Sequence, residues 1–221
     1  MTHVFLAGAS RGVGREIAKQ LVIDGHQVTA LLRSPQAEDD LKALGITVVK
    51  GDALDAEGML QVLNSCSPDA VMSSVGGLPS DSGVQPDFVG NKNLIDGAVA
   101  AGATRFILIS SIGSGDSAQA LPPQALETLG PLLREKVQAE AHLAASGLAY
   151  TVIRPGGLVS QPATDQEVLT EDVTVAGSIP RPGVARLAVK CLTSDRAKNK
   201  IFSAIDLSMQ RGEQAFAKVE L

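Results

Sequence analysis

Three glycines near the start of the chain are spaced so that backbone amides could bind phosphate. Residues 8–14 read Gly-Ala-Ser-Arg-Gly-Val-Gly, between a short apolar run (residues 4–7) and an amphipathic segment (residues 13–24). Glycine lets backbone N–H groups approach a ligand closely, and the amino end of a helix carries partial positive charge. An ordinary strand-to-helix turn needs only one of these glycines. The segment predicts a site for the diphosphate of a dinucleotide, although its spacing is G-x-x-x-G-x-G and not the common G-x-G-x-x-G.

Arg33 stands where a dinucleotide site distinguishes NAD from NADP. It follows the apolar run of residues 28–32, at the point where an Asp or Glu would bind the ribose 2′-hydroxyl of NAD. A guanidinium at this point can bind a 2′-phosphate through paired, charge-assisted hydrogen bonds, and Arg11 in the glycine turn could close from the other side. The alternative is that Arg33 is a solvated charge at a strand end. We expect the coenzyme to be NADP(H).

Strands and helices that alternate along the chain must position these residues. Strands are expected at residues 4–7, 28–32, 47–49, 70–74, 106–110, 150–154 and 201–204, and helices at residues 13–24, 37–44, 56–65, 87–101, 124–146 and 183–193. This alternation predicts an α/β fold, a Rossmann-like, doubly wound parallel sheet in a three-layer α/β/α arrangement. A glycine follows four of the predicted helices, as is typical of helix ends (Gly25, Gly45, Gly102 and Gly147). We expect a single NAD(P)-binding domain over residues 1–221.

Three connections, at residues 76–86, 112–123 and 155–179, are longer than the fold requires. Each follows the carboxyl end of a strand, where ligands bind in open α/β sheets. They are expected to form a substrate pocket, although long loops without function are the alternative. At the same edge, Asp52 could accept a hydrogen bond from adenine, or it could, like Asp55, cap the next helix. Ser74 and the residues after it are small enough for a ribose and a nicotinamide to pass close to the backbone.

The composition excludes several classes of function. A net charge of −5 and an aromatic content of 3% argue against nucleic-acid binding, which needs a basic face or stacking rings. No apolar run approaches the ~18 residues of a membrane span, and no signal peptide is expected. Cys66 and Cys191 lie far apart without neighbouring metal-ligand residues, so we expect reduced, buried thiols, no metal site and a cytoplasmic location. The expected partner is a small-molecule substrate, and the expected state is a monomer or homodimer.

Several ordered motifs give the chain a wider resemblance. They are residues 8–14, Gly51-Asp52, residues 93–96 (NLID), residues 105–113 (RFILISSIG), Lys136 with Ala139-Glu140, and residues 146–156 (SGLAYTVIRPG). Over roughly residues 4–206 the chain resembles the short-chain dehydrogenase/reductase superfamily, in its atypical, NmrA-like and biliverdin/flavin-reductase-like branch. The resemblance implies a Rossmann-like core, a nicotinamide dinucleotide over the glycine turn, and a pocket built by the later loops.

The resemblance also identifies candidates for catalysis. Active members place a Tyr four residues before a Lys on one helix face, so that the ammonium lowers the phenol pKa, and a Ser at the end of the fifth strand helps. This chain has Ser110-Ser111 and Lys136, but Leu132 stands where the Tyr would be, and Tyr150 belongs to the next strand. By resemblance, Lys136 would bind the nicotinamide ribose; the alternative is an exposed cation.

The candidate catalytic residues are therefore Ser111 and Lys136. On the loop after Ser111, Ser114 and Asp116 could orient a substrate or relay a proton, or could simply stabilise the loop through hydrogen bonds. The residues expected to bind the coenzyme are Gly8, Ser10, Arg11, Gly12, Val13, Gly14, Arg33, Asp52, Ala53, Ser74, Val75, Gly76 and Lys136.

Three functions are compatible with these residues. The expected one is an NADPH-dependent reductase that transfers hydride to a small conjugated acceptor, of flavin, quinone or bilin type, without the usual Tyr; hydride transfer needs chiefly positioning by the protein. The second is a non-catalytic NADP(H)-binding redox sensor or scaffold protein of NmrA-like type. The third, a nucleotide-sugar epimerase, also needs the missing Tyr, and the chain is short for a sugar-binding lobe.

Overall fold

A large, mainly parallel β-sheet forms the centre of the molecule in the computed structural model, which describes residues 1–77 and 85–221. Within these ranges the sheet has eight strands in the order β3-β2-β1-β4-β5-β6-β10-β8. The strands are β1 (His3–Ala7), β2 (Gln27–Leu32), β3 (Thr47–Lys50), β4 (Ala70–Ser73), β5 (Arg105–Ile109), β6 (Ala149–Pro155), β8 (Glu167–Thr170) and β10 (Lys200–Asp206). The chain winds outward from β1 in both directions, so β1 and β4 flank the point where the strand order reverses. Ligands bind at such a point in open α/β sheets.

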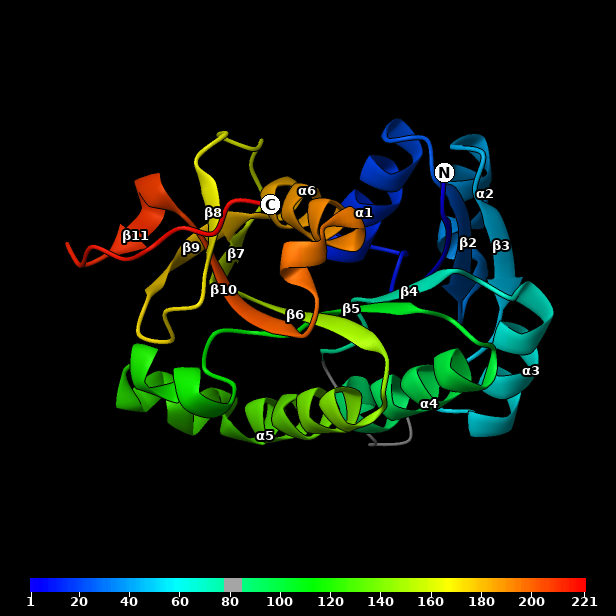
Figure 1. Cartoon of the computed structure of the whole chain (residues 1–221), viewed down its shortest axis with the longest axis horizontal. Helices are drawn as coiled ribbons and strands as arrows, with labels where there is room; N and C mark the ends of the chain where they lie inside the picture. Colours follow the sequence, from blue (N-terminus) through cyan, green and yellow to red (C-terminus); the bar gives the residue numbers. More distant parts are fainter. Residues whose placement is uncertain (78–84) are drawn as a thin grey trace.

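Helices cover both faces of this sheet, which gives the three expected layers (Figure 1). They are α1 (Gly12–Ile23), α2 (Glu38–Ala43), α3 (Ala56–Cys66), α4 (Pro86–Ala100), α5 (Pro123–Ala145) and α6 (Arg181–Thr193). One apolar core joins the sheet to α1, α2 and α6 through side chains such as Ile17, Leu41 and Val184. The other joins it to α3, α4 and α5 through residues such as Leu63 and Leu94. The Rossmann-like fold predicted from the alternating pattern is confirmed.

Each predicted strand and helix is present, with its ends within three residues of those predicted. The four glycines predicted to end helices adopt positive φ values: Gly25 76°, Gly45 81°, Gly102 73° and Gly147 84°. These values lie in the left-handed region that helix C-termini reserve mostly for glycine. The ends of these four helices could therefore be predicted from local sequence alone.

Two parts of the structure differ from the prediction. Residues 155–179, predicted as a loop, contain β7 (Gly157–Val159), β8 and β9 (Ala176–Pro180). Strand β8 pairs antiparallel with β10, while β7 and β9 join β11 (Gln210–Arg211) in a separate small sheet. Short strands of this kind depend on partners far away in the sequence, and their own residues show no clear alternation. In the C-terminal tail, Val219 forms an isolated antiparallel bridge with Leu169 of β8.

The two cysteines differ in burial. Cys191 is buried, and burial raises its pKa to about 12, whereas Cys66 is only half-buried. No helix within residues 1–77 and 85–221 combines the length and the apolar character that a membrane span requires. In the same ranges, no group of three or more His, Cys, Asp or Glu side chains is placed to hold a metal ion.

Candidate functional site

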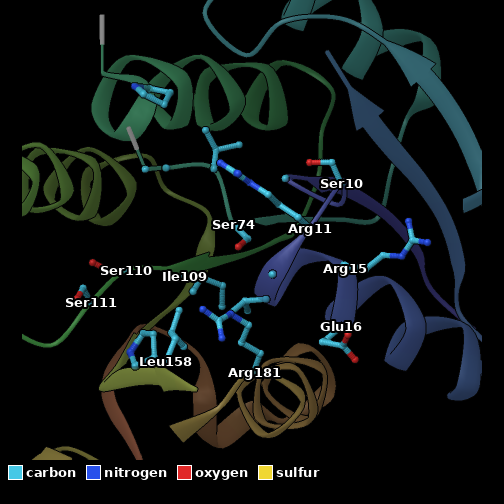
Figure 2. A pocket seen from close by; sticks show the side chains of 18 of the residues that line it. Ser10, Arg11, Arg15, Glu16, Ser74, Ile109, Ser110, Ser111, Leu158 and Arg181 are labelled. Atoms are coloured by element: carbon cyan, nitrogen blue, oxygen red, sulfur yellow. The ribbon is translucent and has the colours of Figure 1, made fainter. Parts of the chain in front are cut away.

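A cavity of about 1250 Å³ opens at the carboxyl edge of the sheet. Its wall is built from residues that follow β1 to β6 and from the start of α6, and Figure 2 shows these side chains converging from several elements. Its lining includes every residue expected to bind the coenzyme except Gly14. It also includes both catalytic candidates, Ser111 and Lys136. The sequence-predicted residues are thus brought together at the predicted edge.

The glycine turn between β1 and α1 is packed too tightly for side chains at two positions. Gly8 has a φ of 89°, and a Cβ there would lie 2.8 Å from the Ser74 carbonyl group. Gly14, on the inner side of α1, faces Gly8, and a Cβ on Gly14 would lie 2.1 Å from the Gly8 carbonyl oxygen. Gly12 also borders the cavity, with a φ of 59°, but a Cβ there would meet only Arg181 Nε, at 3.9 Å. The first and last glycines hold the turn and the helix together, and the middle one leaves the turn open to a ligand.

The amino end of α1 has the features of an anion site. Its N-cap residue, Arg11, makes no side-chain capping hydrogen bond, and the first turn contains no acidic residue. The first backbone N–H groups of a helix have no partner within the helix, so a bound diphosphate can satisfy them. Both the steric cradle and the free amides therefore fit the diphosphate of a nicotinamide dinucleotide.

Arg11, Arg15 and Arg33 line the part of the cavity between the glycine turn and the end of β2. Arg33 is exposed directly after β2 and has no side-chain partner within the described residues, whereas Arg15 forms an ion pair with Asp40 at 2.8 Å. Figure 2 shows Arg11 and Arg15 pointing in different directions from the turn. Because a carboxylate already neutralises Arg15, Arg33 is the better candidate to meet a phosphate group.

The two possible roles of Asp52 are now distinguishable. Asp55 is the N-cap of α3 and accepts a hydrogen bond from the Gly58 amide at 3.0 Å. Asp52 lines the cavity, where Oδ1 accepts from the Leu54 amide at 3.0 Å. The capping role therefore belongs to Asp55, and Asp52 is in a position to face an adenine ring.

The backbone after β4 is held in place by Asn91 of α4. Its side chain accepts a hydrogen bond from Ser73 Oγ at 2.5 Å and donates to the Val75 carbonyl oxygen at 3.2 Å. These contacts fix Ser74, Val75 and Gly76, all of which line the cavity. Of the predicted loop at residues 76–86, residues 78–84 lie outside the described part of the chain, and Gly76, Gly77 and Pro86 border the cavity.

Lys136 reaches the cavity from α5 and is held there by a buried carboxylate. Its Nζ lies 2.8 Å from Oδ1 of Asp87, a residue in the first turn of α4 whose side chain is fully buried. The geometry of this contact is that of an ion pair and not of an aligned hydrogen bond. The other carboxylate oxygen accepts from the Gly77 amide at 3.0 Å. Asp87 thus orients Lys136 and leaves ammonium protons free for a ligand.

The residues after β5 and on α5 form the floor of the cavity. Ser110, Ser111 and Leu132 all line it, and Leu132 is the residue four positions before Lys136. Ser111 Oγ donates to the Ile112 carbonyl oxygen at 2.9 Å. Tyr150 lines a different, smaller cavity of about 330 Å³.

Below the floor lies a buried polar cluster, which we call the Ser110–Glu140–Arg154 cluster. Ser110 donates a hydrogen bond to Glu140, and Arg154 donates to both carboxylate oxygens, at 3.2 and 2.6 Å. Arg154 also pairs with Asp116. Burial alone would lower the pKa of Arg154, but its hydrogen bonds to Glu140 and Asp116 and their charges raise it. Arg154 therefore stays charged and keeps Glu140 paired.

The loop at residues 112–123 lies outside the main cavity. Its 3₁₀ helix (Gly115–Ala120) contains Asp116, and Ser114 just before it is fully buried. Neither side chain lines the main cavity. Their contacts are those of residues that stabilise a loop, whereas Leu158, Ser160 and Pro162 from the third predicted loop do line the cavity.

Sequence reasoning assigned no role in the site to Asp87, Glu140 or Arg181. Asp87 gave no signal beyond its charge, and Glu140 appeared only in the motif Ala139-Glu140, because the partner of each lies on another element, 49 and 30 positions away. Arg181, the first residue of α6, lines the cavity with its Nη1 bonded to Ser160 Oγ at 2.8 Å (Figure 2). Its Nε is 3.9 Å from where a Cβ of Gly12 would be, so it adds positive charge beside the glycine turn.

Comparisons with known proteins agree with this geometry. A family model described as NAD(P)H-binding matches residues 8–195. The chain is 32% identical, over 91% of its length and 76% of the other, to the uncharacterized chloroplastic protein At2g34460 of Arabidopsis thaliana. It is 38% identical to sanguinarine reductase of Eschscholzia californica, over 53% of this chain and 44% of that one. The solved structure of ChuY, an anaerobillin reductase from Escherichia coli O157:H7, superimposes with a TM-score of 0.85 at 30% identity and covers 96% of this chain and 100% of its own.

Proposed function

Because the chain belongs to the NAD(P)H-binding family, we propose that it is an NADPH-dependent reductase that transfers hydride to a small conjugated acceptor of flavin, quinone or bilin type. The names of two similar proteins, ChuY as an anaerobillin reductase and sanguinarine reductase, support a reductase with an extended aromatic or tetrapyrrole-like substrate. For this chain, the acceptor and the choice of NADPH are part of the proposal.

The size and composition of the cavity carry this proposal. A single small-molecule site usually measures about 300–1,000 Å³, and this cavity of about 1250 Å³ extends beyond the predicted coenzyme residues to Leu158, Gln161 and Pro162. A dinucleotide between Arg33 and Lys136 would leave that end for an acceptor. Its wall there is partly apolar, as a planar conjugated ring requires.

The coenzyme would supply the hydride, and the chain would supply positioning. Amides of the glycine turn would hold the diphosphate, with Arg181 beside them, and Arg33 would bind the 2′-phosphate. Lys136, oriented by Asp87, would bind the hydroxyl groups of the nicotinamide ribose. Each of these roles uses a side chain or amide that already borders the cavity.

Leu132 determines which acceptors suit this site. A simple ketone needs a proton donor beside its oxygen in the transition state, and Leu132 offers none. A flavin, quinone or bilin distributes the incoming charge over its conjugated system, so that water can supply the proton. The site thus favours acceptors that do not depend on a tyrosine.

A panel of acceptors tests the proposed function. Purified protein is mixed with NADPH and, separately, with riboflavin, menadione and biliverdin, and the loss of NADPH absorbance is followed. We expect at least one acceptor to be reduced well above the protein-free rate. Absence of turnover with all three, in protein that binds NADPH, would instead support the second candidate, a non-catalytic NADP(H) sensor, which Leu132 in the cavity also favours.

Two expectations from the sequence stay predictions. The first is the state of the protein as a monomer or homodimer that does not bind nucleic acid. The second is a cytoplasmic location; the name of one similar protein, At2g34460, places that protein in the chloroplast.

Replacing Lys136 by Met tests its role. Loss of the ammonium removes charge-assisted hydrogen bonds to the ribose, so we expect kcat/KM for NADPH to fall roughly 10- to 100-fold. Initial rates at varied NADPH, together with the Kd from fluorescence titration, measure the effect. The same change also leaves Asp87 without its ion pair, so stability is followed by thermal melting.

A matched control is Lys92→Met. Lys92 lies on the neighbouring helix α4 in an exposed ion pair with Asp96 at 2.6 Å, and does not line the cavity. Exposed pairs contribute little, so kinetics and melting should barely change. A folded Lys136→Met variant with wild-type affinity and rate would contradict the assignment of Lys136.

A further inference from the structure

We propose that Ser110 acts as a hydrogen-bond acceptor toward the cavity and thereby selects acceptors that carry an N–H group. This inference rests on the proposed reductase function and deepens it, because it distinguishes flavins and bilins from quinones. Oxidised flavins have one ring N–H, and bilins have pyrrole and lactam N–H groups. Quinones offer only carbonyl oxygens.

The direction of the hydrogen bonds beneath the cavity floor fixes the role of Ser110. Glu140 receives Ser110 Oγ–H and two N–H groups of Arg154, so each of its contacts within the described residues comes from a donor. A carboxylate that accepts from a guanidinium is ionised and has no proton to give. The single hydroxyl proton of Ser110 is therefore directed away from the cavity, toward Glu140.

Ser114 accounts for a second position around the Ser110 oxygen. The two hydroxyl oxygens are 3.3 Å apart, and either could be the donor on distance alone. Because the proton of Ser110 already points to Glu140, Ser114 must donate and Ser110 must accept. Ser114 is fully buried, so water does not compete for this bond. The result is a one-way chain, from Ser114 to Ser110 to Glu140.

Ser110 lines the cavity, and its oxygen then has one lone pair left for a ligand there. A hydroxyl oxygen has two lone pairs, of which Ser114 occupies one. A ligand N–H can satisfy the other. A carbonyl oxygen placed there would face another acceptor and lose its hydrogen bonds to water, which is costly in a buried site. Arg154 keeps Glu140 in an ion pair, so this polarity persists as long as the cluster is intact.

Lumiflavin and its N3-methyl derivative form a matched pair of probes. They share one ring system, but methylation removes the N–H of the oxidised flavin. For the wild-type protein we expect kcat/KM, or affinity where turnover is slow, to be about tenfold higher for lumiflavin, which is the effect of one hydrogen bond in a site built for it. Both are measured with saturating NADPH, by NADPH absorbance and by quenching of flavin fluorescence.

Two substitutions test the chain of hydrogen bonds. Ser110→Ala should remove the preference and bring the ratio close to one. Glu140→Gln should do more, because the new amide can donate to Ser110 and release its hydroxyl proton toward the cavity. The ratio should then fall to one or below, and menadione should gain relative to lumiflavin. Ratios within one variant do not depend on the fraction of folded protein, so a purely structural role of Glu140 would leave them unchanged.

Ser117→Ala is the control. Ser117 is buried in the same loop and donates to the Ser114 carbonyl oxygen at 2.7 Å, but does not line the cavity. Its ratio should equal that of the wild type. Equal handling of the two flavins by the wild-type protein would overturn the inference, as would a Ser110→Ala variant that loses NADPH affinity and keeps the preference. If none of the flavins, menadione and biliverdin is reduced, the reductase proposal fails, while the binding ratio of the two flavins still tests Ser110.

Discussion

Replacing Arg33 by Asp is expected to weaken the binding of NADP⁺ by about two orders of magnitude and to change the Kd for NAD⁺ by threefold or less. The two coenzymes differ only in the 2′-phosphate. The change removes the guanidinium that would bind this group and puts a like charge in its place, and a carboxylate can also bind the ribose hydroxyl of NAD. Isothermal titration calorimetry with both oxidised coenzymes measures the effect.

Lys50→Asp gives the same change in charge at a neighbouring strand end. Lys50 is the last residue of β3, is exposed, and does not line the cavity. It should leave both Kd values near those of the wild type, because charges outside the site are screened by salt. Equal weakening of NADP⁺ and NAD⁺ by Arg33→Asp would show that Arg33 does not meet the 2′-phosphate.

The parts of the fold that the sequence predicted are those with a local physical cause. Short apolar strands, helix-length segments and glycines at helix ends each have a recognisable pattern over a few residues. The handedness of the crossovers then leaves few possible topologies. Strands β7, β8, β9 and β11 escaped prediction because each is stabilised by pairing with a strand remote in the sequence.

The residues of the candidate site also fall into those that local sequence could predict and those that it could not. The glycine turn, Arg33 and Asp52 could be found because their position relative to a strand end determines what they can contact. Lys136 and Ser111 came from a resemblance to a family, and the structure places both at the cavity. Asp87, Glu140 and Arg181 could not be found, because a charged residue in a helix has the same local pattern whether it is exposed or faces a buried partner on another element.

Gly14→Ala is expected to have the largest effect on the folded protein. A Cβ at this position would lie 2.1 Å from the Gly8 carbonyl oxygen and 2.7 Å from its carbon. Both are backbone atoms, which cannot rotate away as a side chain could, so α1 must move away from β1. We expect a loss of roughly 3 kcal/mol, at the upper end for overpacking, and a decrease in Tm of roughly 6–12 °C. Thermal melting followed by circular dichroism measures the change.

The matched control is Gly130→Ala, the same substitution in helix α5. Apart from its chain neighbours, a Cβ there would meet nothing closer than the flexible end of Arg134, at 3.5 Å. Alanine is the better helix former by roughly 0.5–1 kcal/mol, but the ring of Pro131 crowds the Cβ of the residue before it, so we expect a much smaller change in Tm than for Gly14→Ala. The difference in size separates tight packing at Gly14 from any general effect of alanine.

The glycine turn also links stability to coenzyme binding, so NADPH affinity gives a second measurement for Gly14→Ala. If α1 moves away from β1, its free amides move with it, and NADPH affinity should fall even at temperatures where the variant is folded. Gly130→Ala should bind NADPH like the wild type. A Gly14→Ala variant with unchanged Tm and affinity would mean that the contact between Gly14 and Gly8 does not set the position of the helix, and the predicted diphosphate site would lose its structural basis.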